Sequence, residues 1–158
     1  MQRGRFTRIG LIADTHGLLR PELRDVFAGV EHIVHAGDVG STEVLEGLAA
    51  IAPVTAVRGN VDGGLGLPEV ARRELAGVRI VVVHGDRLGS PTPEKVAKAF
   101  AGADLLVYGH SHRPEIRRVG GVLVVNPGSA GRRRFRDPVS VALAELRDGE
   151  ATVTLMPL

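Results

Sequence analysis

Short apolar runs alternate with amphipathic segments over the first two thirds of the chain. The apolar runs are bounded by turn residues, which is typical of buried strands. We expect these strands at residues 8–13, 31–34, 54–57, 70–75, 78–83 and 105–108. Apolar residues at helical spacing predict helices between the runs. We expect these helices at residues 21–30, from residue 41 onward and at 92–100.

The last third of the chain has a different pattern, in which glycine turns separate alternating strands. From Pro114 onward, strands are expected at residues 115–119, 121–125, 139–146 and 151–156, as a meander. Strand–helix units followed by a meander favour an α/β fold in which the sheets are mixed. The 158 residues contain no repeat and no linker, so we expect a single domain over residues 1–158.

Composition and charge exclude several classes of protein. Hydrophobic residues are 44% and charged residues 24% of the chain, which is typical of a globular protein. The absence of cysteine excludes disulfides, thiolate metal sites and a cysteine nucleophile. Aromatic residues are only 3%, and the net charge of +2 depends on the arginines of residues 132–136, so nucleic-acid binding is not indicated. No apolar run is long enough for a membrane span, and the first one stops at Asp14, so we expect a cytoplasmic protein.

Potential metal ligands follow five of the predicted strands. If those strands lie side by side and point the same way, their polar side chains meet at one rim of the sheet. The candidates are Asp14, His16, Asp38, Asn60, His84, His110 and His112.

The donor chemistry of this set favours a pair of divalent cations. Oxygen and imidazole donors without thiolate suit Mn, Fe, Zn or Ni. Seven donors exceed what one zinc ion needs, and they suffice for two ions if one carboxylate is shared. Two such ions, roughly 3.5–4 Å apart, form a clamp for in-line attack at phosphorus. With two carboxylates and a hydroxide the clamp keeps a net positive charge, which attracts an anionic phosphoester.

The order of these motifs resembles that of the metallophosphoesterase superfamily, also called calcineurin-like phosphoesterases. The family pattern D-x-H, G-D, G-N, H and G-H-x-H corresponds to Asp14/His16, Gly37-Asp38, Gly59-Asn60, His84 and Gly109-His110/His112. The match runs from residue 9 to about residue 128, and the short chain is similar to the compact bacterial and archaeal phosphodiesterases. The small subunit of eukaryotic retromer shares their fold. The resemblance implies a four-layer αββα sandwich with mixed sheets.

The resemblance also implies how the donors are shared between two metals. One metal would be held by Asp14, His16, Asp38 and His112, and the other by Asp38, Asn60, His84 and His110. Asp38 would bridge them, and a hydroxide bridging the metals would be the nucleophile. We expect Mn as the metal, with Fe, Ni or Zn as alternatives, and relatives suggest a homo-oligomer.

One departure from the family pattern concerns the leaving group. Many larger members have a histidine directly after the asparagine as a general acid, but this chain has Val61, which cannot transfer a proton. We therefore assign no protein general acid, with His35 as a substitute or an outer-shell partner. We expect Arg58 to face either substrate or solvent. We expect Asp62 either to form a hydrogen bond to a loop of the site or to stabilise its own turn.

Three further predictions concern the remaining loops and the function itself. The Asn126–Ser129 segment is expected to form a wall of the site, and the arginines of residues 132–136 form a solvated loop or bind phosphate. We predict a phosphoric ester hydrolase that acts as a phosphodiesterase on a small-molecule phosphoester. A phosphomonoesterase with the same site and a non-catalytic protein-binding scaffold are the alternatives, and the complete ligand set favours an enzyme.

Overall fold

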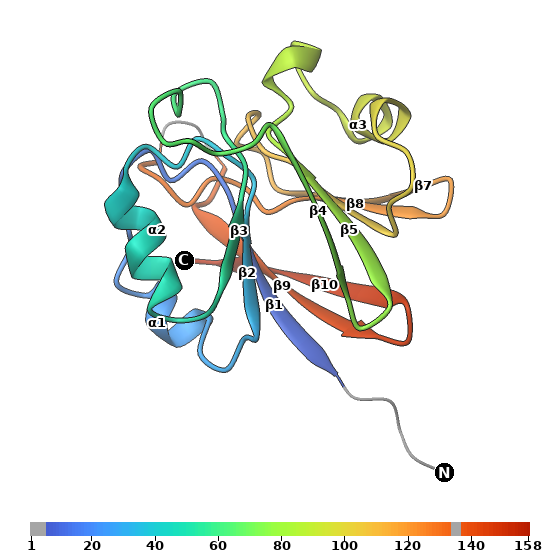
Figure 1. Ribbon diagram of the computed structural model, residues 1–158, viewed down its shortest axis with the longest axis horizontal. Coiled ribbons are helices and arrows are strands. Elements are labelled where there is room, and N and C mark those ends of the chain that lie inside the picture. Colours follow the sequence, from blue (N-terminus) through green and yellow to red (C-terminus); the bar gives the residue numbers. More distant parts are fainter. Residues whose placement is uncertain (1–5, 134–136) are drawn as a thin grey trace.

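Two five-stranded sheets face each other in the computed structural model, which describes residues 6–133 and 137–158 (Figure 1). The first sheet has the order β10-β9-β1-β2-β3 and the second β4-β5-β6-β8-β7. The strands of the first sheet are β1 (Thr7–Ile12), β2 (His32–His35), β3 (Val54–Ala56), β9 (Ser140–Arg147) and β10 (Glu150–Pro157). Those of the second are β4 (Val70–Leu75), β5 (Val78–Val83), β6 (Leu105–Val107), β7 (Glu115–Val119) and β8 (Val122–Asn126).

Both sheets mix parallel and antiparallel strands. In the first sheet β1, β2 and β3 run parallel while β9 and β10 are antiparallel neighbours. In the second sheet β5, β6 and β8 run parallel, and β4 and β7 are antiparallel edge strands. The mixed α/β fold class is therefore confirmed.

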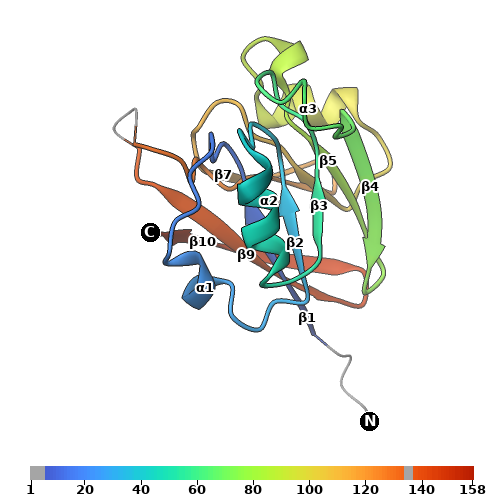
Figure 2. The ribbon, with the colours of Figure 1, turned by 60° about the vertical axis from the view of Figure 1, so that its left-hand side comes forward.

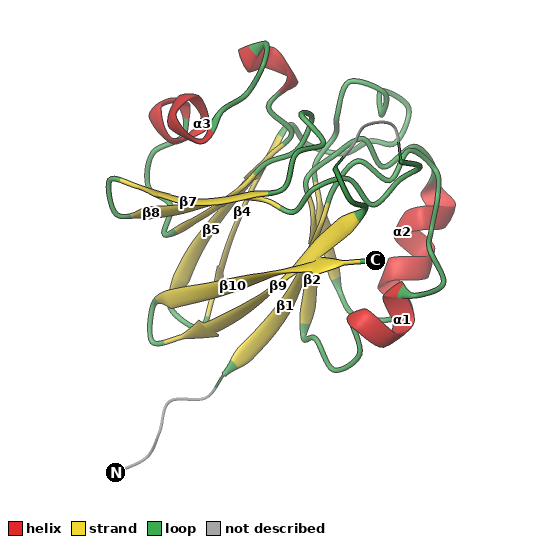
Figure 3. Cartoon of the chain, turned by 180° about the vertical axis from the view of Figure 1, so that it is seen from behind, coloured by secondary structure: helices red, strands yellow, loops and turns green. Residues whose placement is uncertain are grey.

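Helices cover the outer faces of both sheets and complete four layers. The helices α1 (Leu23–Val26) and α2 (Thr42–Ala49) lie on one flank, and α3 (Pro93–Ala99) lies on the other, close to the short 3-10 helix η1 (Asp86–Leu88) (Figure 3). Figure 2 shows α2 in front of the sheet that contains β2 and β3. None of the described helices is long and apolar enough to cross a membrane.

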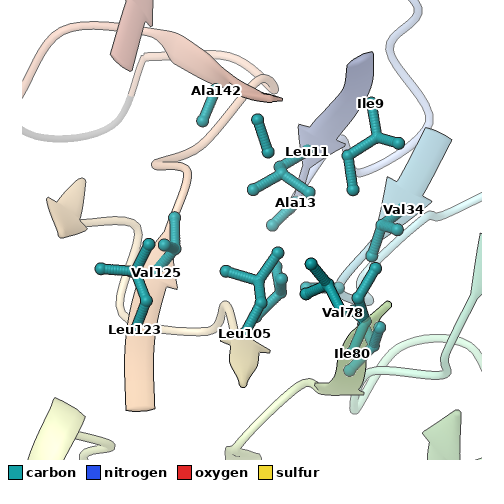
Figure 4. Close-up of a cluster of buried hydrophobic side chains, with 14 of the residues drawn as sticks. Ile9, Leu11, Ala13, Val34, Val78, Ile80, Leu105, Leu123, Val125 and Ala142 are labelled. Atoms are coloured by element: carbon teal, nitrogen blue, oxygen red, sulfur yellow. The ribbon is translucent and has the colours of Figure 1, made fainter. Parts of the chain in front are cut away.

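Alternating side chains fill three apolar layers, as the strand period of two residues requires. Between the sheets, Ile9 and Leu11 of β1 belong to one fully buried cluster with Ile80 and Leu105 of the second sheet (Figure 4). On the outer side of the first sheet the ring of Phe27 lies over Gly10, where a Cβ would come within 2.7 Å of it. A third cluster lies between the second sheet and α3.

The connectivity differs in two respects from what the strand pattern alone suggests, although the two mixed sheets are as expected. The five strands that precede the candidate ligands are not side by side in one sheet, because β1, β2 and β3 belong to the first sheet and β5 and β6 to the second. The last third is not one meander either. The β7–β8 hairpin stays in the second sheet, whereas β9 pairs with β1 in the first.

The expected helix at residues 21–30 is shorter than its pattern predicted. Only Leu23–Val26 is helical, and Gly29, with φ of 80°, lies in the turn that leads into β2. Helix α2 begins after Ser41 as expected, but the Ser41 side chain makes no capping hydrogen bond, whereas Thr92 accepts one from Lys95 N at the start of α3.

Truncation of the central core tests the packing between the sheets. We expect Leu11→Ala to lower the free energy of unfolding by about 2–5 kcal/mol, because the side chain is fully buried between both sheets. Ile116→Ala, on the half-exposed edge strand β7, is the control and should change it far less. Urea unfolding of both variants measures this, and an equal loss in the two would contradict the assignment of the core.

Candidate metal centre

The turns after five strands bring seven candidate side chains to one end of the sandwich. Asp14 and His16 follow β1, Asp38 follows β2 and Asn60 follows β3. His84 follows β5, and the pair His110 and His112 follows β6. In Figure 1 these turns lie at the top, opposite the hairpin turns of β4–β5 and β9–β10. The rim is thus shared by two sheets.

The donor atoms form two groups that meet at Asp38. Donor atoms of Asp14, His16 and His112 lie within 4.8 Å of one another, and so do those of Asp38, His84 and His110. Asp38 Oδ2 lies 3.2 Å from His84 Nε2 and 3.5 Å from His16 Nε2, so its carboxylate lies between the groups. This arrangement offers two adjacent positions for a cation.

A buried oxygen of Asp14 shows that the first group fits a cation. Asp14 is fully buried, and its Oδ1 accepts no hydrogen bond from any described residue. The Nε2 atoms of His112, His84 and His16 surround it at 3.5, 3.9 and 4.0 Å. Leaving a buried carboxylate oxygen without a donor is costly, and a divalent cation among these atoms removes that cost.

The orientation of Asn60 is consistent with a ligand in the second group. Its amide oxygen lies 3.2 Å from His84 Nε2 and faces acceptor atoms. Only after a half-turn of the amide would its nitrogen donate to Asp38, at 3.0 and 3.1 Å from the two carboxylate oxygens. Amide oxygen, carboxylate and imidazole nitrogen close together form a donor set that suits divalent Mn, Fe, Zn or Ni.

The backbone at the candidate ligands is strained. Seven described residues other than glycine have positive φ, and five of them are candidate ligands. Their φ values are 55° at Asp14, 47° at His16, 54° at Asp38, 74° at His110 and 63° at His112. Positive φ is uncommon outside glycine, and asparagine, aspartate and histidine adopt it more often than other residues. Strain kept at this many reactive side chains indicates a functional site.

Two glycines make the close approach of these turns feasible. Gly37, with φ of 98°, lies against His84, where a Cβ would come 2.7 Å from Nδ1. A Cβ on Gly59 would overlap with the backbone nitrogen and the carboxylate of Asp38. The Asn60 turn therefore lies directly on Asp38.

Burial and neighbouring charges perturb the pKa values within the centre. Burial raises the pKa of the Asp14 carboxyl to about 7, against the opposing effect of the His84 charge. Burial also opposes ionisation of Asp38 and of His84. Their mutual hydrogen bond and attraction outweigh burial, lowering the pKa of Asp38 and raising that of His84.

His35 and Asp62 hold the turns rather than reaching the surface. His35 is fully buried, its Nδ1 accepts from Gly37 N, and its Nε2 therefore donates to Thr15 Oγ1 at 3.0 Å. Burial lowers the pKa of His35 to about 3, so the ring is neutral. Asp62 accepts hydrogen bonds from Val39 N, Gly40 N and Gly59 N, and it ties the Asp38 turn to the Asn60 turn.

The Asn126–Ser129 segment supports two further turns, as its expected place in the site wall suggested. Asn126 Nδ2 donates to Ser111 Oγ at 2.9 Å, between the two histidines of the β6 turn. Ser129 Oγ donates to the Asp14 carbonyl. The residue types alone gave no signal for these two partners, because each bond spans a long stretch of chain.

The remaining candidates lie at the edge of the centre. Val61 is 51% exposed directly after Asn60. Arg58 is half-buried and forms an ion pair with Glu69. Arg132 and Arg133 are exposed, and the rest of the arginine cluster, residues 134–136, lies outside the described residues.

Comparison with known proteins gives a consistent result. The pattern of the calcineurin-like phosphoesterase superfamily domain matches residues 7–149. A probable metallophosphoesterase of Methanothermobacter thermautotrophicus is 38% identical over 151 residues, covering 90% of this chain and 87% of that protein. A phosphodiesterase of Methanocaldococcus jannaschii is 27% identical over 141 residues, covering 77% and 82%. Vacuolar Protein Sorting 29 from Cryptosporidium parvum has the same fold, with a TM-score of 0.80, 24% identity and 99% of each chain covered.

The contact between Gly59 and Asp38 can be tested with two glycines of one loop. We expect Gly59→Ala to weaken Mn²⁺ binding at least about tenfold, because the new methyl group displaces Asp38. Gly63→Ala is the matched control, since nothing lies within 4 Å of a Cβ there. Calorimetric titration of both variants measures the effect, and equal affinities would contradict the close packing of the two turns.

The raised pKa of Asp14 predicts how stability depends on pH in metal-free protein. Between about pH 4 and pH 7 the folded state keeps the Asp14 proton that the unfolded state has lost, so stability falls as pH rises. In chelator we therefore expect Asp14→Asn to raise the Tm by several degrees at pH 8, with a smaller gain at pH 5.

In saturating Mn²⁺ the Tm of the wild type should exceed that of Asp14→Asn, because the wild-type carboxylate then binds the cation. Asp25→Asn, an exposed change on α1, serves as the control. Melting curves at both pH values decide the matter. Identical curves for wild type and Asp14→Asn in chelator would show that burial does not penalise this charge.

Proposed function

The chain belongs to the calcineurin-like phosphoesterase superfamily, and we propose that it is a phosphodiesterase that uses two divalent cations. The observation that supports this proposal most is that two groups of oxygen and nitrogen donors meet at Asp38, and that in one of them the buried Oδ1 of Asp14 lies among imidazoles without a hydrogen-bond donor from the described residues. The proposed ligands of one cation are Asp14, His16, Asp38 and His112. Those of the other are Asp38, Asn60, His84 and His110.

The residues of the chain would position the cations and attract the substrate. Asp38 lies between the two donor groups, so one carboxylate would contact both ions. Two carboxylates neutralise only half of the charge of two divalent cations, and the centre therefore attracts an anionic phosphoester. The ions would polarise a phosphoryl oxygen and activate water for attack at phosphorus.

Among the described residues, none outside the proposed metal ligands is placed to protonate a leaving group. Val61, at the position of the histidine of larger relatives, has no proton to give. His35 is buried and neutral, and its Nε2–H is directed to Thr15, which argues against a role as the acid. General acids typically contribute about 10²–10⁴-fold to rate, so esters with good leaving groups should be the best substrates.

A diester substrate and Mn²⁺ are the specific parts of the proposal. The named phosphodiesterase among the relatives supports a diester, and a monoester is the alternative for the same clamp. Nitrogen and oxygen donors suit Mn²⁺, with Fe, Ni and Zn as the other metals to compare.

Removal of the shared carboxylate tests the proposal. We expect wild-type protein with Mn²⁺ to hydrolyse bis(p-nitrophenyl) phosphate faster than p-nitrophenyl phosphate and to lose turnover in chelator. Asp38→Asn should reduce turnover by more than the roughly 10–100-fold that loss of an outer-shell partner costs, because it weakens both cation positions. Asp25→Asn, on the exposed side of α1, should leave turnover unchanged.

Metal content separates the alternatives. Elemental analysis should find two cations in each wild-type chain and fewer in Asp38→Asn. A faster rate on the monoester would assign a phosphomonoesterase. Bound metal without turnover on either ester, with any of the four metals, would favour the protein-binding scaffold.

A further inference from the structure

A cleft that opens beside His84 has no role in the proposed centre. It lies between the end of β3, the start of β4 and the η1 turn, and it is partly open to solvent. Its residues include Arg58, two positions before Asn60, and Arg87, three positions after His84. A group bound there would therefore be next to the candidate cations.

The floor of this cleft is apolar. Val70, Leu88 and Phe100 line it, and all three are half-buried side chains at the margin of the cluster under α3. Part of the surface of each of these three side chains is open to solvent in the described structure. Apolar surface left open beside a polar centre favours a ligand that has an apolar part.

Two arginines form the rim of the cleft and share one partner. Arg58 Nη2 and Arg87 Nη2 both contact Glu69 Oε1. Glu69 and Asp86, which also lines the cleft, balance the charges of the two arginines, and the shared Glu69 carboxylate holds the two guanidinium groups next to each other. The Arg58 backbone is held as well, because its N–H donates to the Pro68 carbonyl at 2.8 Å. Guanidinium planes stack on aromatic rings, and they attract anions.

We infer that this cleft, the arginine cleft, binds the aromatic group of an aryl phosphodiester. The inference rests on the proposed phosphodiesterase function, and it names the class of ester. An aromatic ring uses both features of the cleft, because one face covers the apolar floor and the other stacks on a guanidinium plane. A saturated group would use only the floor, and a second anion would use only the arginines.

Non-hydrolysable phosphonates with a single organic group test this directly. Phenylphosphonate, cyclohexylphosphonate and methylphosphonate are titrated into the full-length Mn²⁺-loaded protein by calorimetry. We expect phenylphosphonate to bind about tenfold more tightly than methylphosphonate, with cyclohexylphosphonate between them because it covers the floor without stacking. Equal affinities of the phenyl and methyl compounds would overturn the inference, as would tighter binding of the cyclohexyl compound.

Variants locate the preference in the arginine cleft. Arg58→Ala and Arg87→Ala should each reduce the ratio of phenyl to methyl affinity to below about threefold, while methylphosphonate affinity changes little. Arg113→Ala is the matched control, an exposed arginine in a different hollow beside His110, and it should keep the full ratio. An unchanged ratio in both cleft variants, or an equal loss of affinity for all three compounds, would refute an aromatic site at these arginines.

Turnover of bis(p-nitrophenyl) phosphate in the same preparation separates the two proposals. Turnover without any preference for the phenyl compound refutes only the inference that the arginine cleft binds an aromatic group. A phenyl preference that Arg58→Ala removes, in protein without turnover, supports the cleft and refutes the phosphodiesterase function.

Discussion

The main energetic constraint on this structure is that two carboxylates lie close together among imidazole rings and away from water, which is unfavourable in free energy. Asp14 is fully buried, Asp38 is nearly so, and each lies within 4 Å of the imidazole nitrogen of His84. Without a cation the Asp14 charge is penalised so strongly that its pKa rises to about 7. Such a group of side chains persists in a fold only when the surrounding structure fixes it and when something positive compensates it.

The sandwich provides this fixing through its strands and the turns between them. Parallel strands of both sheets end at the same rim, and each candidate ligand lies in the first turn after its strand. Buried polar side chains then join the turns: His35 holds Thr15, Asp62 joins the Asp38 and Asn60 turns, and Asn126 holds Ser111. Rigid turns of this kind explain how five candidate ligands can keep positive φ values.

Much of this arrangement was predictable from local sequence pattern. The β4 and β5 hairpin has the expected bounds, because alternation and the Ala76-Gly77 turn are local signals. The division of the strands into two sheets was not predictable from the strand pattern, since an apolar run shows that a strand is buried and not which strand it pairs with. The pairing of β9 with β1 and the contacts of Asn126 and Ser129 depend on long-range packing that residue types do not encode. The strand ends and the family motifs predicted which residues gather and that their donors suit cations, and the structure adds a buried Asp14 Oδ1 to which no described residue donates a hydrogen bond.

The central claim is that these side chains bind a pair of cations, and anomalous diffraction from Mn²⁺-soaked crystals tests it most directly. The account predicts two anomalous peaks roughly 3.5–4 Å apart. One peak should lie among Asp14, His16 and His112, the other among Asn60, His84 and His110, with Asp38 between them. A single peak outside these residues, or none at saturating Mn²⁺, would contradict it.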